Sequence, residues 1–256
     1  MNAFIRPRPV DTPALRLVGF HHAGGSAGSY HRMGRQLPDD WDLLLYDLPG
    51  RGRRHAEPAL RDAAAVLRQV LADLDPWNDA PTAFFGHSFG AVVALETARA
   101  RAQAGHQPVW VGVSGHRPPS RRPSGRLTDL ADDALLSTLV EMGGVPRPLA
   151  EVPEIAVRLL GLTRADLYAA ESYAPSPGRP ALSCPLTVFG GTADPWAPRS
   201  EMGDWARETR DVCRWRYFPG GHFYLLGAAL PDITSEVVAE IRLAAPWTVW
   251  SDPACA

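Results

Sequence analysis

The chain has 256 residues, which is enough for one complete α/β domain with a full hydrophobic core, and its formal net charge of −2 argues against a nucleic-acid-binding surface. No segment has the length and apolarity of a membrane span, and the first residues lack the apolar run of a signal peptide. Three widely spaced cysteines, Cys184, Cys213 and Cys255, predict neither a disulfide framework nor a zinc site, so we expect an unprocessed cytoplasmic protein.

All 26 basic residues are arginines. The absence of lysine excludes a P-loop, a pyridoxal Schiff base and a Ser-Lys dyad, because each of these sites needs an amine that a guanidinium group cannot replace. A nucleophile in this chain would therefore be activated by a histidine or a carboxylate.

The first predicted strand covers Leu15 to Phe20 and is followed by a loop of small residues, His21 to Ser26. A helix is expected around Tyr30 to Leu37. The loop could offer the backbone N–H of Ala23 to a developing oxyanion, whereas its two histidine side chains are most simply explained by local hydrogen bonding.

A second strand is predicted over Trp41 to Leu48, and apolar residues at helical spacing predict a helix over Asp62 to Leu74. The turn between them contains Arg51, Arg53 and Arg54. These arginines are most simply a solvated turn, and the alternative is that they bind an acidic partner.

The next unit contains the clearest motif of the chain. A short apolar strand beginning at Thr82 and a helix over Ala91 to Arg99 flank the pentapeptide Gly86-His87-Ser88-Phe89-Gly90. This G-x-S-x-G pattern between a strand and a helix forces a serine onto a sharp turn with its hydroxyl exposed. It predicts Ser88 as a nucleophile and the Phe89 N–H, at the positive end of the helix, as an oxyanion donor.

After a further strand over Val109 to Ser114, the alternation of strands and helices predicts a doubly wound, mostly parallel sheet. Residues 116 to 176 then change in character, because they are rich in proline and arginine at first and helical afterwards, with no convincing strand. An all-helical insertion at this point predicts a mobile lid over the carboxyl edge of the sheet, and the alternative is that these helices only pack the core.

Two further motif residues follow the last predicted strands. Asp194 lies in a glycine-rich turn after the strand Leu186 to Phe189, and His222 follows the strand Cys213 to Phe218. A carboxylate in such a turn can orient an imidazole, although a turn aspartate often only caps a helix. The chain order Ser88, Asp194, His222 is the nucleophile-acid-base order of α/β-hydrolases.

Taken together, these motifs show that the chain resembles type II thioesterases of the α/β-hydrolase fold, the stand-alone editing enzymes of modular polyketide and nonribosomal peptide synthesis. The resemblance is carried by His22-Ala23-Gly24-Gly25-Ser26, Leu48-Pro49-Gly50-Arg51-Gly52, Gly86-His87-Ser88-Phe89-Gly90, Gly190-Gly191-Thr192-Ala193-Asp194-Pro195 and Gly220-Gly221-His222-Phe223. It implies a single α/β-hydrolase domain over residues 1–256, with 116–176 as a helical lid subdomain.

The resemblance also implies the reaction. The expected substrates are acyl thioesters on the phosphopantetheine arm of acyl or peptidyl carrier proteins, and the expected task is to remove aberrant or stalled acyl groups. No metal and no bound cofactor is expected, since the phosphopantetheine belongs to the carrier. Two alternatives stay open at this point: an oxygen-ester carboxylesterase or lipase with the same triad, and a non-catalytic binding protein on this fold.

Site residues follow from the same motifs. The catalytic residues are Ser88, Asp194 and His222, and the oxyanion donors are the backbone N–H groups of Ala23 and Phe89. Many relatives carry methionine in place of Phe89, which changes the bulk beside the nucleophile but leaves the backbone donor. Candidate substrate contacts beside the motifs are His22, Gly24, His87, Trp196 and Phe223.

A cluster of arginines at the start of the insertion is a candidate docking surface. Arg117, Arg121, Arg122 and Arg126 could border the entrance and bind an acidic carrier domain. The alternative is a solvated, proline-rich loop.

Overall fold

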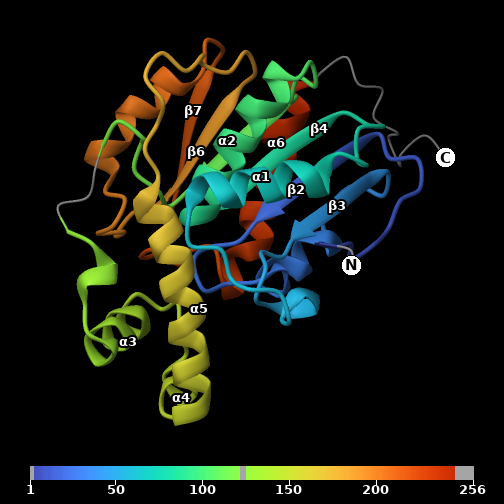
Figure 1. Cartoon of the computed structure of the whole chain (residues 1–256). Helices are drawn as coiled ribbons and strands as arrows, with labels where there is room; N and C mark the ends of the chain where they lie inside the picture. Colours follow the sequence, from blue (N-terminus) through green and yellow to red (C-terminus); the bar gives the residue numbers. More distant parts are fainter. Residues whose placement is uncertain (1–2, 122–124, 246–256) are drawn as a thin grey trace.

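The computed structural model describes residues 3–121 and 125–245 and contains one seven-stranded sheet with the strand order β1-β3-β2-β4-β5-β6-β7 (Figure 1). Strand β1 pairs antiparallel with β3, and all the other pairs are parallel. The strands are β1 (Phe4–Ile5), β2 (Leu15–Phe20), β3 (Trp41–Tyr46), β4 (Thr82–His87), β5 (Trp110–Ser114), β6 (Leu186–Gly191) and β7 (Cys213–Phe218).

Helices connect successive strands over both faces of the sheet. They are η1 (Ala27–Arg35), η2 (Gly52–Arg54), α1 (Ala63–Leu74), α2 (Phe89–Gln103), η3 (Leu127–Asp129), α3 (Asp132–Glu141), α4 (Arg147–Ala150), α5 (Pro153–Ser172), η4 (Arg199–Glu208), η5 (Gly227–Ala229) and α6 (Leu230–Ala244). Parallel strands covered on both faces are mostly apolar, and β2, β3 and β5 are buried at every position, including Arg16 in β2 and Asp42 in β3. The predicted doubly wound, mostly parallel sheet is confirmed.

The two faces of the sheet have separate apolar cores. Helices α1, α2 and η4 share one cluster with the sheet, and η1 and α6 share the other. Helix α1 begins where the sequence predicts, because the Asp62 carboxylate accepts a hydrogen bond from the N–H of Ala64 and caps the helix. None of the helices in the described ranges combines the length and apolarity needed to cross a membrane.

Some local predictions were wrong. The segment predicted as a helix around Tyr30 to Leu37 is a 3₁₀ helix that begins at Ala27, and its two glycines, Gly28 and Gly34, disfavour a regular α-helix. Strand β1 was missed because two residues are too few to show an alternating pattern. Cys184 and Cys213 are free thiols, and Cys255 lies outside the described residues.

The insertion between β5 and β6 contains η3, α3, α4 and α5, which project beyond the sheet layers (Figure 1). These helices have a small apolar cluster of their own. Its buried members are Leu135, Leu139, Val145, Leu160 and Leu167. The insertion is therefore partly self-supporting and does not depend on the main core for all of its packing.

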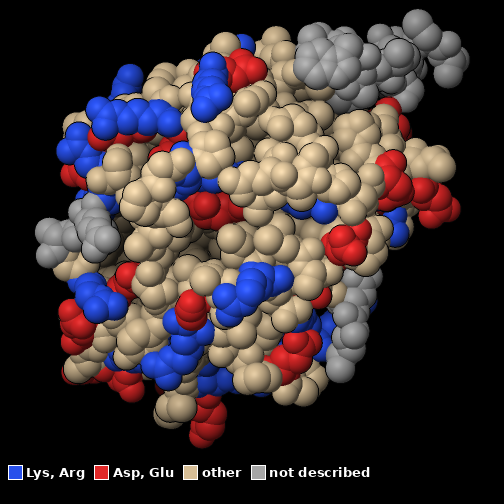
Figure 2. Space-filling view, turned by 45° about the horizontal axis from the view of Figure 1, so that its top comes forward, with Lys and Arg blue, Asp and Glu red and all other residues tan. Residues whose placement is uncertain are grey.

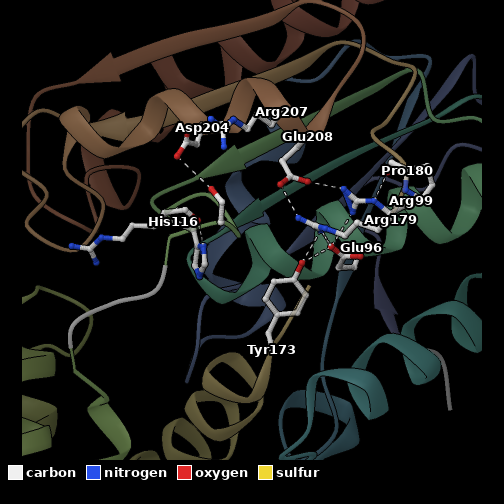
Figure 3. A network of polar contacts seen from close by, with 11 residues as sticks. Glu96, Arg99, His116, Tyr173, Arg179, Pro180, Asp204, Arg207 and Glu208 are labelled. Atoms are coloured by element: carbon white, nitrogen blue, oxygen red, sulfur yellow. Dashed lines mark hydrogen bonds and ion pairs between the residues drawn. The ribbon is translucent and has the colours of Figure 1, made fainter. Parts of the chain in front are cut away.

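A partly buried polar network holds the C-terminal end of α5 against the body of the protein (Figure 3). Glu208 of η4 accepts hydrogen bonds from Arg99 of α2, at 2.8 Å, and from Arg179, at 2.7 Å. Glu96 of α2 pairs with the same two arginines and accepts a hydrogen bond from the Tyr173 hydroxyl. Because Tyr173 ends α5, this network fixes that end of the helix against α2 and η4.

Candidate active site

The strand order brings the predicted site residues to one edge of the sheet. Ala23 follows β2, Ser88 follows β4, Asp194 follows β6 and His222 follows β7. Strand β4 pairs directly with β2, and β6 pairs with β7, all in parallel. The carboxyl ends of these four strands therefore lie along the same edge, where ligands bind in open α/β sheets.

Ser88 has a strained backbone conformation, as the motif predicts. It is the only non-glycine residue in the described ranges with a positive φ, at φ 54° and ψ −121°, and it lies at the N-cap of α2. The flanking glycines permit this turn. A Cβ on Gly86 would collide with the backbone of Gly90, and a Cβ on Gly90 would lie 2.7 Å from the carbonyl oxygen of His21.

Asp194 and His222 form a buried hydrogen-bonded pair. Asp194 Oδ2 lies 2.9 Å from His222 Nδ1, and the two side chains are 0% and 5% exposed. The other oxygen, Oδ1, accepts hydrogen bonds from the N–H groups of Trp196, at 2.8 Å, and Ala197, at 3.2 Å. Burial opposes ionisation of Asp194, but the hydrogen bond from His222 and the two backbone donors outweigh it, so the pKa of Asp194 lies below its ordinary value.

His222 lies beside the turn that carries Ser88. Its ring centroid is 5.0 Å from that of His87, the residue that precedes Ser88. The backbone N–H of Ser88 donates to the carbonyl of Ser114 at 2.7 Å, which fixes the turn against the end of β5. This neighbourhood of hydroxyl, imidazole and carboxylate can perform nucleophilic catalysis.

His87 lies beneath the site and does not line it. Its side chain is 0% exposed, and its Nδ1 lies 2.8 Å from Ser114 Oγ, which in turn lies 2.6 Å from the hydroxyl of Tyr224. Burial, with smaller effects from His222 and His22, holds the pKa of His87 well below its ordinary value. This burial argues against the predicted substrate contact of His87, which instead packs under the ring of His222.

The backbone N–H groups predicted as oxyanion donors make no hydrogen bond to an acceptor in the described part of the protein. Within the described ranges, neither Ala23 nor Phe89 donates its backbone N–H to another residue. Phe89 opens α2, where the first amides of a helix have no intrahelical acceptor. The side chain of His22 is buried and its Nδ1 lies 3.0 Å from the Tyr30 hydroxyl, which agrees with the expected local role.

A small cavity of about 20 Å³ separates the predicted site from the insertion. His22, Ala23, Gly24 and Phe223 line one side, and Leu139, Gly144, Val145, Leu159 and Thr163 line the other. Three of the five predicted substrate contacts are therefore at this cavity. Trp196 is not among the lining residues, and the structure gives it a different task, since its backbone N–H holds Asp194.

A larger open pocket, of about 610 Å³, lies at the opposite edge of the sheet beside Arg6, Arg16 and Trp77. Its guanidinium groups are paired with Asp42 and Asp79, so its charges are compensated within the protein. We therefore place the chemistry at the carboxyl edge.

Comparison with known proteins decides the family. The model of the thioesterase domain family matches residues 15–241. The chain belongs to the thioesterase family. It is a hydrolase of thioesters, as the resemblance implied, and its α/β-hydrolase fold is confirmed.

The relatives of this thioesterase include solved type II thioesterases from biosynthetic clusters and pathways. PikA5, a thioesterase of Streptomyces venezuelae, is 38% identical over 222 residues, which cover 86% of this chain and 79% of PikA5. The solved type II thioesterase BorB, from the borrelidin biosynthetic cluster, matches with a TM-score of 0.85 at 34% identity, covering 93% of this chain and 97% of BorB. YbtT, a type II thioesterase from the yersiniabactin NRPS/PKS pathway, matches with a TM-score of 0.84 at 28% identity, covering 94% and 99%. The resemblance to type II thioesterases is confirmed.

The predicted docking arginines of the thioesterase have carboxylate partners. Arg117 pairs with Glu201, Arg121 with Asp204 and Arg126 with Glu171. Arg122 lies outside the described residues. The side chains of Arg121 and Arg126 remain about half exposed, at 55% and 53%. Basic and acidic side chains are interspersed over the face shown in Figure 2, so no large surface of one charge appears there.

The prediction of a solvated turn at residues 51–54 was wrong for two of its three arginines. Arg51 and Arg54 are buried, at 5% and 4% exposed, whereas Arg53 is exposed. Arg54 pairs with Glu57 and Asp73, and Arg51 pairs with a carboxylate of α5. The alternative, that these two arginines bind an acidic partner, is excluded by the same contacts.

Sequence reasoning missed three residues that support the site. Ser114 and Tyr224 lie under His87, and Asp166 of α5 reaches the loop that contains Ala23. Tyr224 had a usable signal, since it lies two residues after His222 in the final motif. The other two residues had none, because only the fold brings them to the site.

Proposed function

We propose that Ser88, His222 and Asp194 form the catalytic triad and that the enzyme releases acyl groups from the phosphopantetheine arm of carrier proteins. The buried hydrogen bond between Asp194 and His222, beside the strained turn of Ser88 at the same sheet edge, carries this proposal. The description of YbtT supports the substrate class, since it places that type II thioesterase in an NRPS/PKS pathway.

In the proposed mechanism, the Ser88 hydroxyl attacks the acyl carbonyl while His222 takes its proton. The backbone N–H groups of Ala23 and Phe89 stabilise the oxyanion. The C–S bond breaks, the thiol leaves with the proton held by His222, and the acyl group remains on Ser88 as an ester. Water then attacks this ester with His222 again as base, which releases a carboxylic acid and restores the serine. A thiol with a pKa of roughly 8.5 is a good leaving group, and the residues in these roles need no metal.

We assign the insertion, residues 116–176, as a lid over this site. The support is the small cavity, which is lined on one side by the proposed oxyanion loop and on the other by α3, α5 and the turn between α3 and α4. A space of about 20 Å³ cannot hold an acyl chain. The helices of the insertion therefore have to move outward before substrate enters.

The carrier protein is the proposed partner, and the exposed arginines at the start of the insertion are its proposed contact. The charge reversal Arg121→Glu should raise KM for an acyl-carrier substrate several-fold and leave KM for a small acyl thioester unchanged. Arg207→Glu is the matched control, because Arg207 lies in η4 and pairs with the same carboxylate as Arg121, that of Asp204. Equal effects on both substrates would eliminate docking as the explanation.

The test of the proposed function compares Ser88→Ala with the wild type on an acyl-carrier thioester and on the matched oxygen ester. Removal of the nucleophile should lower kcat by about 10⁶-fold. A wild-type preference for the thioester supports editing over an esterase or lipase role. Unchanged hydrolysis in Ser88→Ala would show that the proposed triad is not the catalytic one, and a folded wild type without hydrolysis would favour a binding protein.

A further inference from the structure

The loop that carries one proposed oxyanion donor is in direct contact with helix α5 of the insertion. Gly24, the residue after Ala23, has φ +75°, and a Cβ added to it would lie 3.1 Å from the Cβ of Thr163 and still closer to its hydroxyl. At this point the loop backbone therefore packs directly on the Thr163 side chain of the helix, with no room for a Cβ on Gly24. The position of α5 therefore restricts the position of the neighbouring residue, Ala23.

Asp166 of α5 and Arg51 add hydrogen bonds to this contact, and we call this buried pair the clamp. Asp166 Oδ2 accepts a hydrogen bond from the Gly24 N–H at 2.8 Å. The same carboxylate accepts two hydrogen bonds from Arg51, at 2.6 Å to Oδ2 and 2.7 Å to Oδ1. Arg51 also donates to the carbonyl of Gly25 at 3.0 Å. The two backbone groups that follow Ala23 are thus held by one ion pair.

The ion pair of the clamp is buried, which strengthens its hydrogen bonds. The side chains of Arg51 and Asp166 are 5% and 2% exposed. A bidentate guanidinium-carboxylate pair fixes direction as well as distance, and burial removes the water that would otherwise compete for the donors. A buried pair is weak evidence for stability, because desolvation offsets much of its attraction. Its position on the backbone that flanks Ala23 indicates a different use.

From these contacts we infer that Arg51 and Asp166 are positioning residues for the oxyanion hole. The carboxylate arrives on a helix of the insertion, so the loop holds Ala23 toward the acyl oxygen only while this part of α5 is seated. Oxyanion stabilisation and the position of the insertion are thereby coupled through Gly24 and Gly25. The inference rests on the proposed function, because it needs the Ala23 N–H to serve the oxyanion.

Asp166→Asn is the sharpest test, because it keeps the shape and breaks the pattern of donors. If the amide oxygen replaces Oδ2, the amide NH₂ faces a donor of Arg51; in the flipped orientation, it faces both the Gly24 N–H and Arg51. Either way one donor meets another. Arg51→Lys is a second test, since an ammonium keeps the charge but cannot bridge both oxygens and the Gly25 carbonyl.

The measurements separate positioning from folding. Active sites are counted by complete labelling of Ser88 with a fluorophosphonate, and kcat is expressed per labelled site. We expect kcat to fall by about 10²-fold in Asp166→Asn while KM changes by less than about threefold, since an oxyanion donor acts in the transition state. The Ki of an acyl trifluoromethyl ketone, whose adduct with Ser88 carries an oxyanion, should rise by the same factor as kcat/KM falls.

Two further variants serve as controls. Asp42→Asn breaks another buried ion pair, with Arg6 and Arg16 at the opposite edge of the sheet, so it should lower Tm and leave kcat per labelled site unchanged. The double variant Arg51→Met/Asp166→Leu replaces the pair by apolar side chains; it should regain Tm relative to Asp166→Asn and remain slow, because the loop has lost its clamp.

The inference is overturned if kcat per labelled site in Asp166→Asn stays within about threefold of the wild type, or if the ketone Ki does not change. It is also overturned if the double variant recovers kcat together with Tm, or if Asp42→Asn loses kcat to the same extent. Failure of the proposed function would look different, because the wild type would then lack Ser88-dependent hydrolysis altogether.

Discussion

The hydrogen bonds around Asp194 make Asp194→Asn a demanding test of the site. Asp194 Oδ1 accepts two backbone N–H groups, from Trp196 and Ala197, and Oδ2 faces His222 Nδ1 at 2.9 Å. In the asparagine variant, the amide oxygen has to take the place of Oδ1, because only an acceptor satisfies the two backbone donors. The amide NH₂ is then directed at His222.

This orientation imposes the wrong tautomer. An NH₂ group opposite Nδ1 requires Nδ1 to be an acceptor, so the proton of the neutral ring moves to Nε2. A ring protonated on Nε2 cannot accept the proton of Ser88, and the imidazolium loses its counter-charge. We expect kcat to fall by about 10⁴-fold, which corresponds to about 5.4 kcal/mol of transition-state stabilisation, with KM almost unchanged.

The assay is steady-state hydrolysis of a small acyl thioester at pH 7, together with thermal unfolding to show that the variant is folded. Asp62→Asn is the matched control, since Asp62 is an exposed helix cap and asparagine caps equally well. A kcat for Asp194→Asn within about tenfold of the wild type would refute the assignment of Asp194 as the partner of the general base.

Other predictions concern stability. Burial lowers the pKa of His21 and His22 to about 3, so the unfolded chain binds protons that the folded chain does not below about pH 6.5. Each of these two histidines should therefore lower the free energy of unfolding by about 1 kcal/mol between pH 6.5 and 5.5, and His21→Gln should reduce the total fall by about that amount, as measured by denaturant unfolding at each pH. Glu208→Gln should cost about 3 kcal/mol in the same assay, because the buried guanidinium group of Arg99 and the partly buried one of Arg179 lose a charged partner. Gly90→Ala should cost about 2–3 kcal/mol, since the new Cβ meets backbone atoms that cannot yield, whereas Gly203→Ala, where the Cβ meets open space, should be neutral in calorimetry.

The sequence predicts those site residues that lie in short sequence motifs. Ser88 could be found because its turn needs two glycines at fixed spacing, and His222 because it follows a strand within a motif. Asp166 could not be found, since it lies 115 residues from Arg51 and nothing in its helix distinguishes it from a surface acid. The fold was readable for the same reason, because buried parallel strands are continuous apolar runs, whereas two-residue β1 left no pattern.

The two ends of helix α5 are held by different numbers of contacts. Its C-terminal end is anchored by Tyr173 and, about two turns earlier, by Asp166, while its N-terminal end at Pro153 follows the short helix α4. From Asp166 to Pro153 the arm is about 20 Å long at 1.5 Å per residue. A tilt of about 15° about Asp166 therefore moves Pro153 by about 5 Å and leaves Asp166 almost in place. Such a tilt would make room for acyl chains of different length beside the N-terminal end of α5. The groups around the reacting carbonyl would stay in place.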